Sequence, residues 1–180
     1  MDQRLNERFF EQIEGYDQLV LDYCVQPTTE EKTNGLLVGR IRVNGVLYGE
    51  SYTVDVRELV KSASVSGEFY IFTCGCGVPQ CTGLDEGIVV IHYPQSLRWL
   101  IPFPMEVGQL SSEERGKKGQ RRIYRECWFK KDEYVAAITA GLEQATRLLE
   151  ATTPQPELCP YGMEIEALQR LNEALKKGQP

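Results

Sequence analysis

Short runs of alternating hydrophobic and polar residues dominate the first third of the chain, and they predict strands. One run covers residues 18–26 and ends at Pro27. Two more, 36–43 and 46–54, flank Asn44-Gly45. Asn-Gly between two β-rich runs indicates a hairpin, because both central residues of a type I′ turn need positive φ. This part is therefore predicted to form an antiparallel ribbon with one solvated face.

Apolar residues at intervals of three and four predict helices nearer the two ends of the chain. Asp55 is expected to cap a short helix that runs through Ser64, and Asp132 to cap a long helix over 132–151. Apolar residues at helical spacing also predict two further helices, through Leu5, Phe9 and Ile13 before Gly15 and through Leu168, Leu171 and Leu175.

The remaining apolar runs complete an α+β prediction. The further predicted strands are 68–74, 87–93, 97–103 and 121–129, with a loop over 104–119 and a linker-like stretch over 152–161. We expect a single α+β domain over 1–180, with a mostly antiparallel sheet, hairpins, an N-terminal helix and two C-terminal helices.

Three of the six cysteines, Cys74, Cys76 and Cys81, lie together in the run Thr73-Cys-Gly-Cys-Gly-Val-Pro-Gln-Cys-Thr-Gly83. Thiolates are soft ligands that suit zinc, and the interleaved glycines permit a tight metal-binding turn. In such a turn backbone N–H groups can point at the sulfur. The residues predict a zinc site that staples a hairpin. Buried thiols that only fill space, or redox chemistry, are the alternatives.

The sequence offers several candidates for the fourth ligand of such a site. His92 is the sole histidine and a natural candidate, since zinc sites often combine Cys and His. If 68–74 and 87–93 form a plain hairpin, however, Cys74 lies opposite Gly87 and His92 is about 16 Å away. The alternatives are Cys127, Cys159, Asp85 or water; a water ligand would permit catalysis, whereas a fourth protein ligand would make the site structural.

The same residues carry a family resemblance. The motif Thr73-Cys-Gly-Cys-Gly77, then Cys81-Thr-Gly83, His92, Trp99 and the stretch 129–138, resembles an uncharacterised family of small bacterial proteins. That family shares a T-C-x-C-G-x3-C-x-G loop. The resemblance covers less than half of the chain, leaves residues 1–65 out, and implies no activity, because none is assigned to the family.

A basic segment, residues 115–131, is the second feature that points to a function. It includes Lys117, Lys118, Arg121 and Arg122, and aromatic residues interleave with the charges as they do on nucleic-acid surfaces. The alternative is a solvated loop that enters a strand, with arginines outward and aromatics inward. We favour the loop, because one basic run in a chain of net charge −6 supplies only part of the necessary field.

Composition narrows the function classes further. The N-terminus is charged where a secretory signal would be apolar, and no long apolar run predicts a membrane span, so we expect a cytoplasmic protein. Phosphate-loop and nucleophile-elbow motifs are absent, as are paired histidines. We therefore predict a non-enzymatic, zinc-stabilised module that binds a protein partner, as an inhibitor, immunity protein or adaptor does. The alternatives are a zinc enzyme with an open coordination site and nucleic-acid binding through 115–131.

Overall fold

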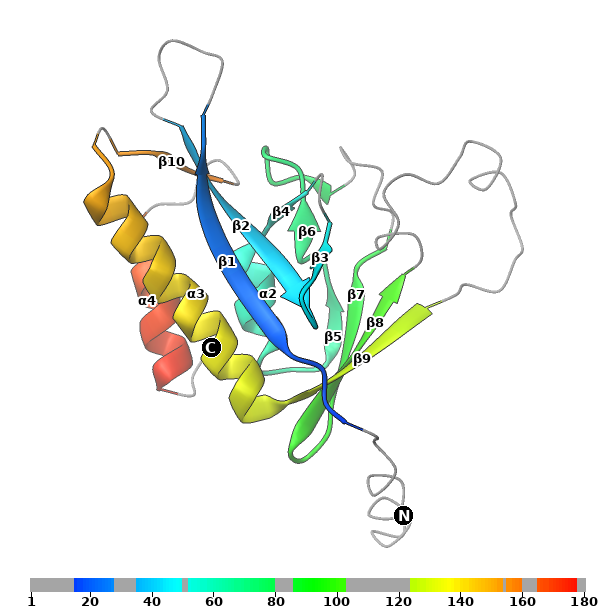
Figure 1. Cartoon of the computed structure of the whole chain (residues 1–180). Helices are drawn as coiled ribbons and strands as arrows, with labels where there is room; N and C mark the ends of the chain where they lie inside the picture. Colours follow the sequence, from blue (N-terminus) through cyan, green and yellow to red (C-terminus); the bar gives the residue numbers. More distant parts are fainter. Residues whose placement is uncertain are drawn as a thin grey trace, which may run out of the picture.

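The computed structural model describes residues 15–27, 35–49, 52–79, 86–102, 124–153, 155–159 and 165–177. Helices and mainly antiparallel sheets make up this part, so the α+β prediction is confirmed (Figure 1). The predicted N-terminal helix and the loop 104–119 fall outside the described residues. The strands are β1 (Leu19–Gln26), β2 (Leu36–Val43), β3 (Val46–Tyr48), β4 (Thr53–Val54), β5 (Gly67–Phe69), β6 (Phe72–Thr73), β7 (Ile88–His92), β8 (Ser96–Pro102), β9 (Tyr124–Lys130) and β10 (Glu157–Cys159); the helices are α2 (Val56–Ser62), α3 (Lys131–Ala151) and α4 (Ile165–Lys176).

The first sheet is built around β2, with β1 and β3 antiparallel to it. Asn44 and Gly45 have φ of 52° and 80°, so the predicted Asn-Gly hairpin is confirmed. The predicted strand 46–54 is interrupted. Gly49 has a φ of 62°, and a Cβ there would lie 2.9 Å from a Phe72 ring carbon, so this position needs glycine on two counts. The chain leaves β3 at this bend and returns as β4.

A strand that the sequence did not reveal, β10, completes the first sheet. It lies in the stretch 152–161, which was predicted to be a linker because Pro154 and Pro156 interrupt the helical pattern. β10 pairs in parallel with β2, Leu158 opposite Leu37 and Cys159 opposite Val38. Prolines end the helix but do not prevent the chain beyond them from pairing with a strand far away in sequence.

The second large sheet has the order β5-β7-β8-β9 and is antiparallel throughout. Its inner face lies on the hydrophobic core, where Trp99 is fully buried between Phe129 and Tyr134, with ring centroids 5.3 and 5.7 Å away. The Ser62 hydroxyl donates to the Leu59 carbonyl at 2.6 Å and lies 2.7 Å from the Tyr134 hydroxyl. The end of α2 and the start of α3 therefore close this face.

Helix α3 lies along β1 and protects the free edge of the first sheet (Figure 1). Gly141 permits the close approach, since a Cβ there would be 2.5 Å from Leu21 Cγ. Gln144 completes the edge: its Oε1 accepts from the Tyr23 N–H at 3.0 Å, and its Nε2 donates to the Tyr23 carbonyl at 3.3 Å. An edge strand with such a cover offers less backbone for unwanted strand pairing.

The beginning of α3 differs from the prediction in its cap. The residue before the helix is Lys130, which makes no side-chain capping bond, and Asp132 lies inside the first turn. Asp132 Oδ1 accepts from the Glu133 N–H at 2.9 Å and still places negative charge at the positive end of the helix. By contrast, Asp55 caps α2 as predicted, accepting from the Arg57 N–H at 3.0 Å.

Asp17 joins the two large sheets. Its backbone N–H donates to the Trp128 carbonyl at 2.6 Å, and its Oδ2 accepts from the Trp128 N–H at 2.7 Å. Its Oδ1 accepts from Asn44 Nδ2 at 2.6 Å, at the hairpin turn of the first sheet. One carboxylate therefore connects the edge of β9 to the turn between β2 and β3.

Candidate functional site: the cysteine loop and the outer face of the second sheet

The cysteine loop follows β6, which pairs with β4 and not with the second large sheet. The turn closes through Gly77, which has a φ of 82° and donates its N–H to the Cys74 carbonyl at 2.9 Å. The Cys76 N–H donates to Cys74 Sγ at 3.3 Å, the N–H to sulfur contact that the glycine-rich turn was predicted to allow. The local geometry places a backbone donor on the first sulfur.

The predicted plain hairpin around this loop is wrong. β5 does pair with β7, Phe69 opposite Ile88, but the chain then leaves that sheet. Ile71 instead accepts from the Asp55 N–H at 2.8 Å, and Phe72 pairs with Val54. Residues 68–74, treated as one strand in the sequence, therefore divide between two sheets, and Cys74 does not lie opposite Gly87.

The structure brings Cys159 to the cysteine loop. Its Sγ lies 3.9 Å from the carbonyl oxygen of Gly75, the residue between Cys74 and Cys76. The Thr53 hydroxyl donates to the Cys159 carbonyl at 3.5 Å. Burial raises the pKa of the Cys159 thiol, and the Thr53 hydroxyl offsets part of that rise. The parallel pairing of β10 with β2 thus delivers a third described sulfur to the loop.

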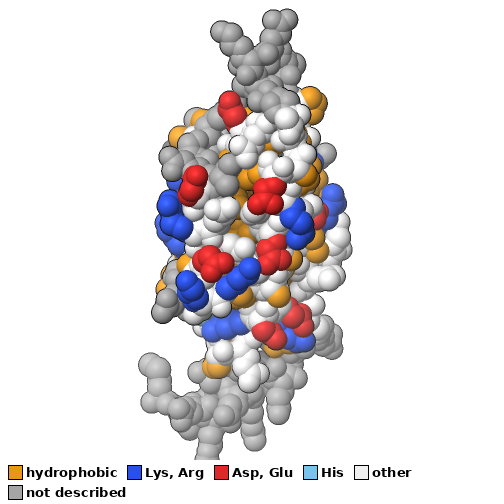
Figure 2. All heavy atoms as spheres, turned by 90° about the vertical axis from the view of Figure 1, so that its left-hand side faces the viewer, with side chains coloured by type: hydrophobic (Ala, Val, Ile, Leu, Met, Phe, Trp, Pro, Cys, Tyr) orange, Lys and Arg blue, Asp and Glu red, His pale blue; other side chains and the backbone are white. Residues whose placement is uncertain are grey.

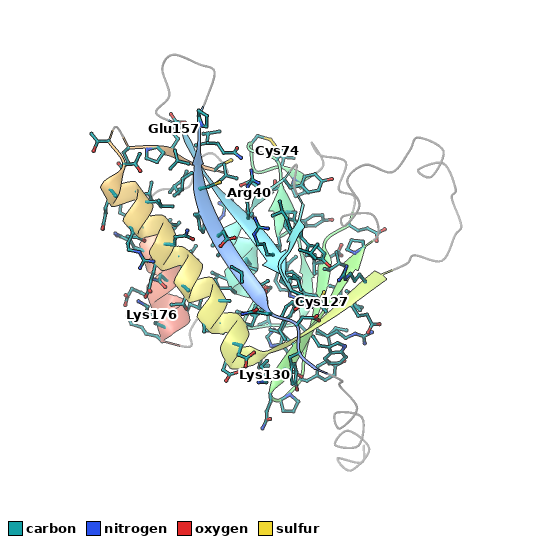
Figure 3. The ribbon with its side chains drawn as sticks, viewed as in Figure 1. Arg40, Cys74, Cys127, Lys130, Glu157 and Lys176 are labelled. Atoms are coloured by element: carbon teal, nitrogen blue, oxygen red, sulfur yellow. A yellow bond between two sulfur atoms is a disulfide. The ribbon has the colours of Figure 1, made fainter. Side chains whose placement is uncertain are left out.

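The sulfurs of Cys74 and Cys76 are joined as a disulfide (Figure 3). Cys81 and Asp85 lie outside the described residues. Among the residues that the structure describes, no three histidine, cysteine or acidic side chains converge closely enough to hold a metal ion. Zinc would need Cys74 and Cys76 as two separate thiolates. The thiols of Cys74, Cys76 and Cys159 are donors of a type that zinc prefers when they are reduced.

His92 lies elsewhere. It is the last residue of β7, and its Nε2 is 2.8 Å from the Ser62 carbonyl oxygen at the end of α2. A carbonyl can only accept, so Nε2 carries the proton in this contact. The opposite end of α2 begins at Asp55, beside Ile71, and a helix of this length spans about 10 Å. The structure therefore does not bring His92 to Cys74 and Cys76.

The other two described cysteines, Cys24 and Cys127, make no contact with the cysteine loop among those that the structure describes. Cys127 is buried on the inner face of β9, opposite Trp99, and burial raises the pKa of its thiol to about 11. Figure 3 shows it well apart from Cys74. Cys24 is half-buried on β1 and lies opposite Val38, the residue that pairs with Cys159 on its other side. Of the alternatives considered for the fourth ligand, Cys159 alone is placed at the loop within the described residues.

The basic segment is only partly visible, because Lys117, Lys118, Arg121 and Arg122 lie outside the described residues. The part within β9 reverses the predicted alternation. Arg125 belongs to the inner face, with its Cζ 5.5 Å from the Tyr48 ring centroid, while Trp128 lies on the outer face. Lys130 pairs with Glu133 at 2.8 Å. In β9 the arginine is therefore inward and the tryptophan outward, opposite to our expectation.

The outer face of the second large sheet is a feature that sequence reasoning missed. We define the outer face by the residues that alternate with the buried ones on β7, β8 and β9. Its apolar members, with Tyr93 directly after β7 included, are all half-buried: Val89, Ile91, Tyr93, Leu100 and Trp128. No helix or strand of the described part packs against them. In 87–93 and 97–103 apolar residues occupy both faces of each strand. Because such a run has no polar face, the sequence does not show which of its two faces is covered.

A compact aromatic and cationic cluster lies on the outer face at the β9 edge of the sheet. The Trp128 ring stacks on Tyr93, with centroids 5.2 Å apart and an interplanar angle of 28°. Arg98 Cζ is 5.3 Å from the Trp128 ring centroid, within range of a cation–π contact. Arg98 also pairs with Glu126. The two contacts hold Trp128 in one position on a face that remains open among described elements.

The helical side of the molecule has a different character. Figure 2 shows Lys and Arg side chains interspersed with Asp and Glu on this side. Two shallow depressions on α3 and α4 are lined by polar and charged side chains, among them Arg147, Gln169 and Glu173, and neither is lined by a cysteine or the histidine. Lys176 pairs with Glu143 at 2.9 Å and links the two helices. The described residues of this side therefore form a surface of mixed charge, without a cluster of cysteine or histidine side chains.

No protein-family model, curated protein or solved structure matches the chain. None of the described helices is both long enough and apolar enough to cross a bilayer.

Proposed function

We propose that the chain is a non-enzymatic protein-binding module of the inhibitor, immunity or adaptor type, and that zinc holds its cysteine loop in the reduced protein. The binding part is carried by one observation, the outer face, which no described helix or strand covers and which has Trp128 on its edge strand β9. The zinc part is supported by the approach of Cys159 to Gly75.

The composition of the outer face suits an interface. Tryptophan, tyrosine and arginine are the residues enriched among those that carry most binding energy, and here Tyr93, Arg98 and Trp128 contact one another. Their mutual contacts hold the side chains in place before a partner arrives, which lowers the entropy cost of association. The flanking Ile91 and Leu100 add apolar area that a partner would remove from water.

The net charge indicates which partners approach fastest. The chain carries a formal net charge of −6, so its field attracts a basic protein over a distance and repels an acidic one. The partner is accordingly a protein of net positive charge that presents apolar side chains to Trp128. Encounter with it slows as salt screens the field, while the apolar contacts at the outer face depend less on salt.

Paired variants test the binding role. Trp128→Ala and Arg98→Ala alter the outer face, and Glu143→Ala on α3 alters the opposite, helical side. We expect a specific partner to bind the parent chain and Glu143→Ala equally, and to bind the two outer-face variants at least about tenfold more weakly, as loss of an interface anchor does. Equal binding to all four proteins would show that the outer face is not the site.

In the zinc site Cys74, Cys76, Cys81 and Cys159 are the ligands. Four thiolates around one zinc ion make a closed, structural site, which contributes directly to folding free energy. Such a site would tie the loop after β6 to β10 and so attach the C-terminal strand to the first half of the chain. The predicted alternative of an open-site enzyme needs a cleft with a general base beside the ion.

Elemental analysis of protein purified under reducing conditions without chelators tests this site. We expect about one zinc per chain in the parent and in the control Cys24→Ser, and a loss of zinc in Cys74→Ser and Cys159→Ser. Removing the zinc with a chelator should lower the midpoint of thermal unfolding. Protein without metal whose cysteines titrate as free thiols would reject the site, as would zinc retained in both Cys74→Ser and Cys159→Ser.

A further inference from the structure

We propose that the Cys74–Cys76 pair is a reversible thiol–disulfide exchange site, which a small-molecule thiol reduces by attacking the sulfur of Cys76. The disulfide joins two residues that a single glycine separates (Figure 3). The site goes beyond the proposed function and does not depend on it, because the exchange needs neither zinc nor a protein partner.

The two residues of the pair differ in exposure. Cys76 is exposed, whereas Cys74, directly after β6, is half-buried. Cys76 lies between Gly75 and Gly77, so its neighbours in sequence have no side chains to obstruct an approaching thiol. Exposed disulfides are the ones that exchange readily, and the nucleophile attacks the sulfur that it can reach. Cys76 is therefore the residue that receives the attack.

The backbone favours the departure of Cys74 from the bond. The Cys76 N–H donates to Cys74 Sγ at 3.3 Å. When the bond breaks, this sulfur takes up a full negative charge, and the same contact becomes a charge-assisted hydrogen bond, which is stronger than a neutral one. A thiolate that its surroundings stabilise leaves faster. Exposure and hydrogen bonding therefore agree on one direction of cleavage.

The exchange takes two steps. In the first, the sulfur of an external thiolate bonds to Cys76 Sγ, the Cys74–Cys76 bond breaks, and its electron pair stays on Cys74 as a thiolate. In the second, another external thiolate attacks the external sulfur of the mixed disulfide and releases Cys76 as a thiolate. Two external thiols are thus oxidised to one disulfide, the protein disulfide is reduced to two thiols, and the protons pass between them through water. The reverse reaction needs only the external disulfide.

The fold holds the two cysteines together after the bond is broken. The Gly77 N–H donates to the Cys74 carbonyl at 2.9 Å, and Thr73 pairs with Thr53 of β4. Neither contact involves the disulfide. The reduced thiols therefore remain neighbours, and their high effective concentration allows the bond to form again. A bond across so short a loop also constrains the unfolded chain very little, so its loss removes little stability.

Cys159 is a nearby thiol that does not act as the nucleophile. Its side chain is buried, and its Sγ lies 3.9 Å from the Gly75 carbonyl oxygen. Because burial raises the pKa of this thiol, it keeps its proton, and a protonated thiol does not attack a disulfide. The attacking thiolate therefore comes from outside the described part of the chain.

Reduction of the full-length, oxidised chain by glutathione, with a chelator present, is the first test. We expect the rate in native buffer to lie within about tenfold of the rate in unfolding concentrations of urea, because an exposed bond reacts without unfolding. Cys24→Ser should match the parent. Oxidised glutathione should then restore the Cys74–Cys76 bond, as mass mapping of peptides shows. Reduction that urea accelerates more than about tenfold, or a restored bond to another cysteine, would overturn the proposal.

The direction of attack has its own measurement. Acid quenching early in the reaction, maleimide labelling of free thiols and mass mapping locate the glutathione in the mixed disulfide. We expect glutathione on Cys76 with the label on Cys74 at least about fivefold more often than the opposite arrangement. Equal amounts of the two, or an excess of glutathione on Cys74, would contradict the assigned direction.

The exchange site and the zinc site fail in different ways. Zinc needs both sulfurs as thiolates, so the oxidised pair cannot supply them, and the chelator keeps zinc out of the exchange reaction. Exchange in a chain that binds no zinc when reduced would reject the zinc part of the proposed function and leave the exchange site standing. Zinc in the reduced chain, together with a disulfide that glutathione reaches only in urea, would overturn the exchange site instead.

Discussion

The two faces of the second sheet carry the same kinds of residue and have different surroundings. Trp99 on the inner face is fully buried against Phe129 and Tyr134, whereas Trp128, one strand away on the outer face, is half-buried and rests on Tyr93. Along each strand, successive side chains alternate between the two faces. The difference arises because α2 and α3 close the inner face and no described element closes the outer one. Apolar residues that no packing explains are candidates for binding.

The largest contrast between the faces should appear in stability. Trp99→Ala removes a fully buried side chain and should lower the free energy of unfolding by about 3–5 kcal/mol. Trp128→Ala removes a side chain that one ring and one cation contact, and should cost about 1 kcal/mol. Urea unfolding of the two variants measures both values. Equal costs would mean that the outer face is as tightly packed as the inner face.

A second contrast concerns alkaline pH and the inner face. Burial raises the pKa of Cys127 from 9.0 to about 11, so between these values the unfolded chain ionises while the folded chain keeps its proton. The folded state therefore loses stability as pH rises from about 9 to about 11, by about 2–3 kcal/mol for this thiol. The measurement is the free energy of unfolding across that pH range.

Cys127→Ala should flatten this pH dependence, and Cys24→Ala on the first sheet should keep it. Burial, and after it the neighbouring Cys127, raise the pKa of Tyr48 to about 12. Tyr48 therefore adds a further loss at the upper end of the range in the parent and in Cys24→Ala, and a smaller loss in Cys127→Ala, where one cause of the raised pKa is removed. If Cys127→Ala retained the full slope, the thiol would be accessible to water and the inner face less closed than the structure indicates.

The smallest effect is expected at the ion pair on the outer face. Arg98 and Glu126 keep 24% and 49% of their side-chain surface exposed, so water screens their attraction. A double-mutant cycle with Arg98→Ala and Glu126→Ala should give a coupling energy of about 0.2–1 kcal/mol, falling with added salt. A coupling of several kcal/mol would show that water screens this pair much less than its exposure indicates.

Much of the fold could be predicted because local signals decide it. The Asn44-Gly45 hairpin needs positive φ at both positions, and Asp55 supplies the side-chain acceptor that starts α2. Helix α3 was found from its apolar stripe, apart from its first residue. These elements depend on residues close in sequence, so their signals are visible without the rest of the chain.

The errors have one physical origin. Residues 68–74 divide between two sheets because Phe72 and Thr73 pair with β4. Strand β10 forms because its residues pair with β2. The orientation of β9 depends on Tyr48, which gives Arg125 an aromatic ring on the inner side. In each case the partner lies far away in sequence, and local propensity contains no information about it.

The residues of the candidate sites also differ in whether local sequence or long-range packing sets their positions. The sequence by itself determined that Cys74, Cys76 and Cys81 lie within eight residues of one another in a glycine-rich run, and this spacing predicts a turn of candidate metal ligands. Only the tertiary structure decided that Cys159 approaches Gly75, that His92 bonds to Ser62, and that Trp128 occupies an open face. Strand pairing and helix cover set these positions, and both arise from long-range packing that no local pattern encodes.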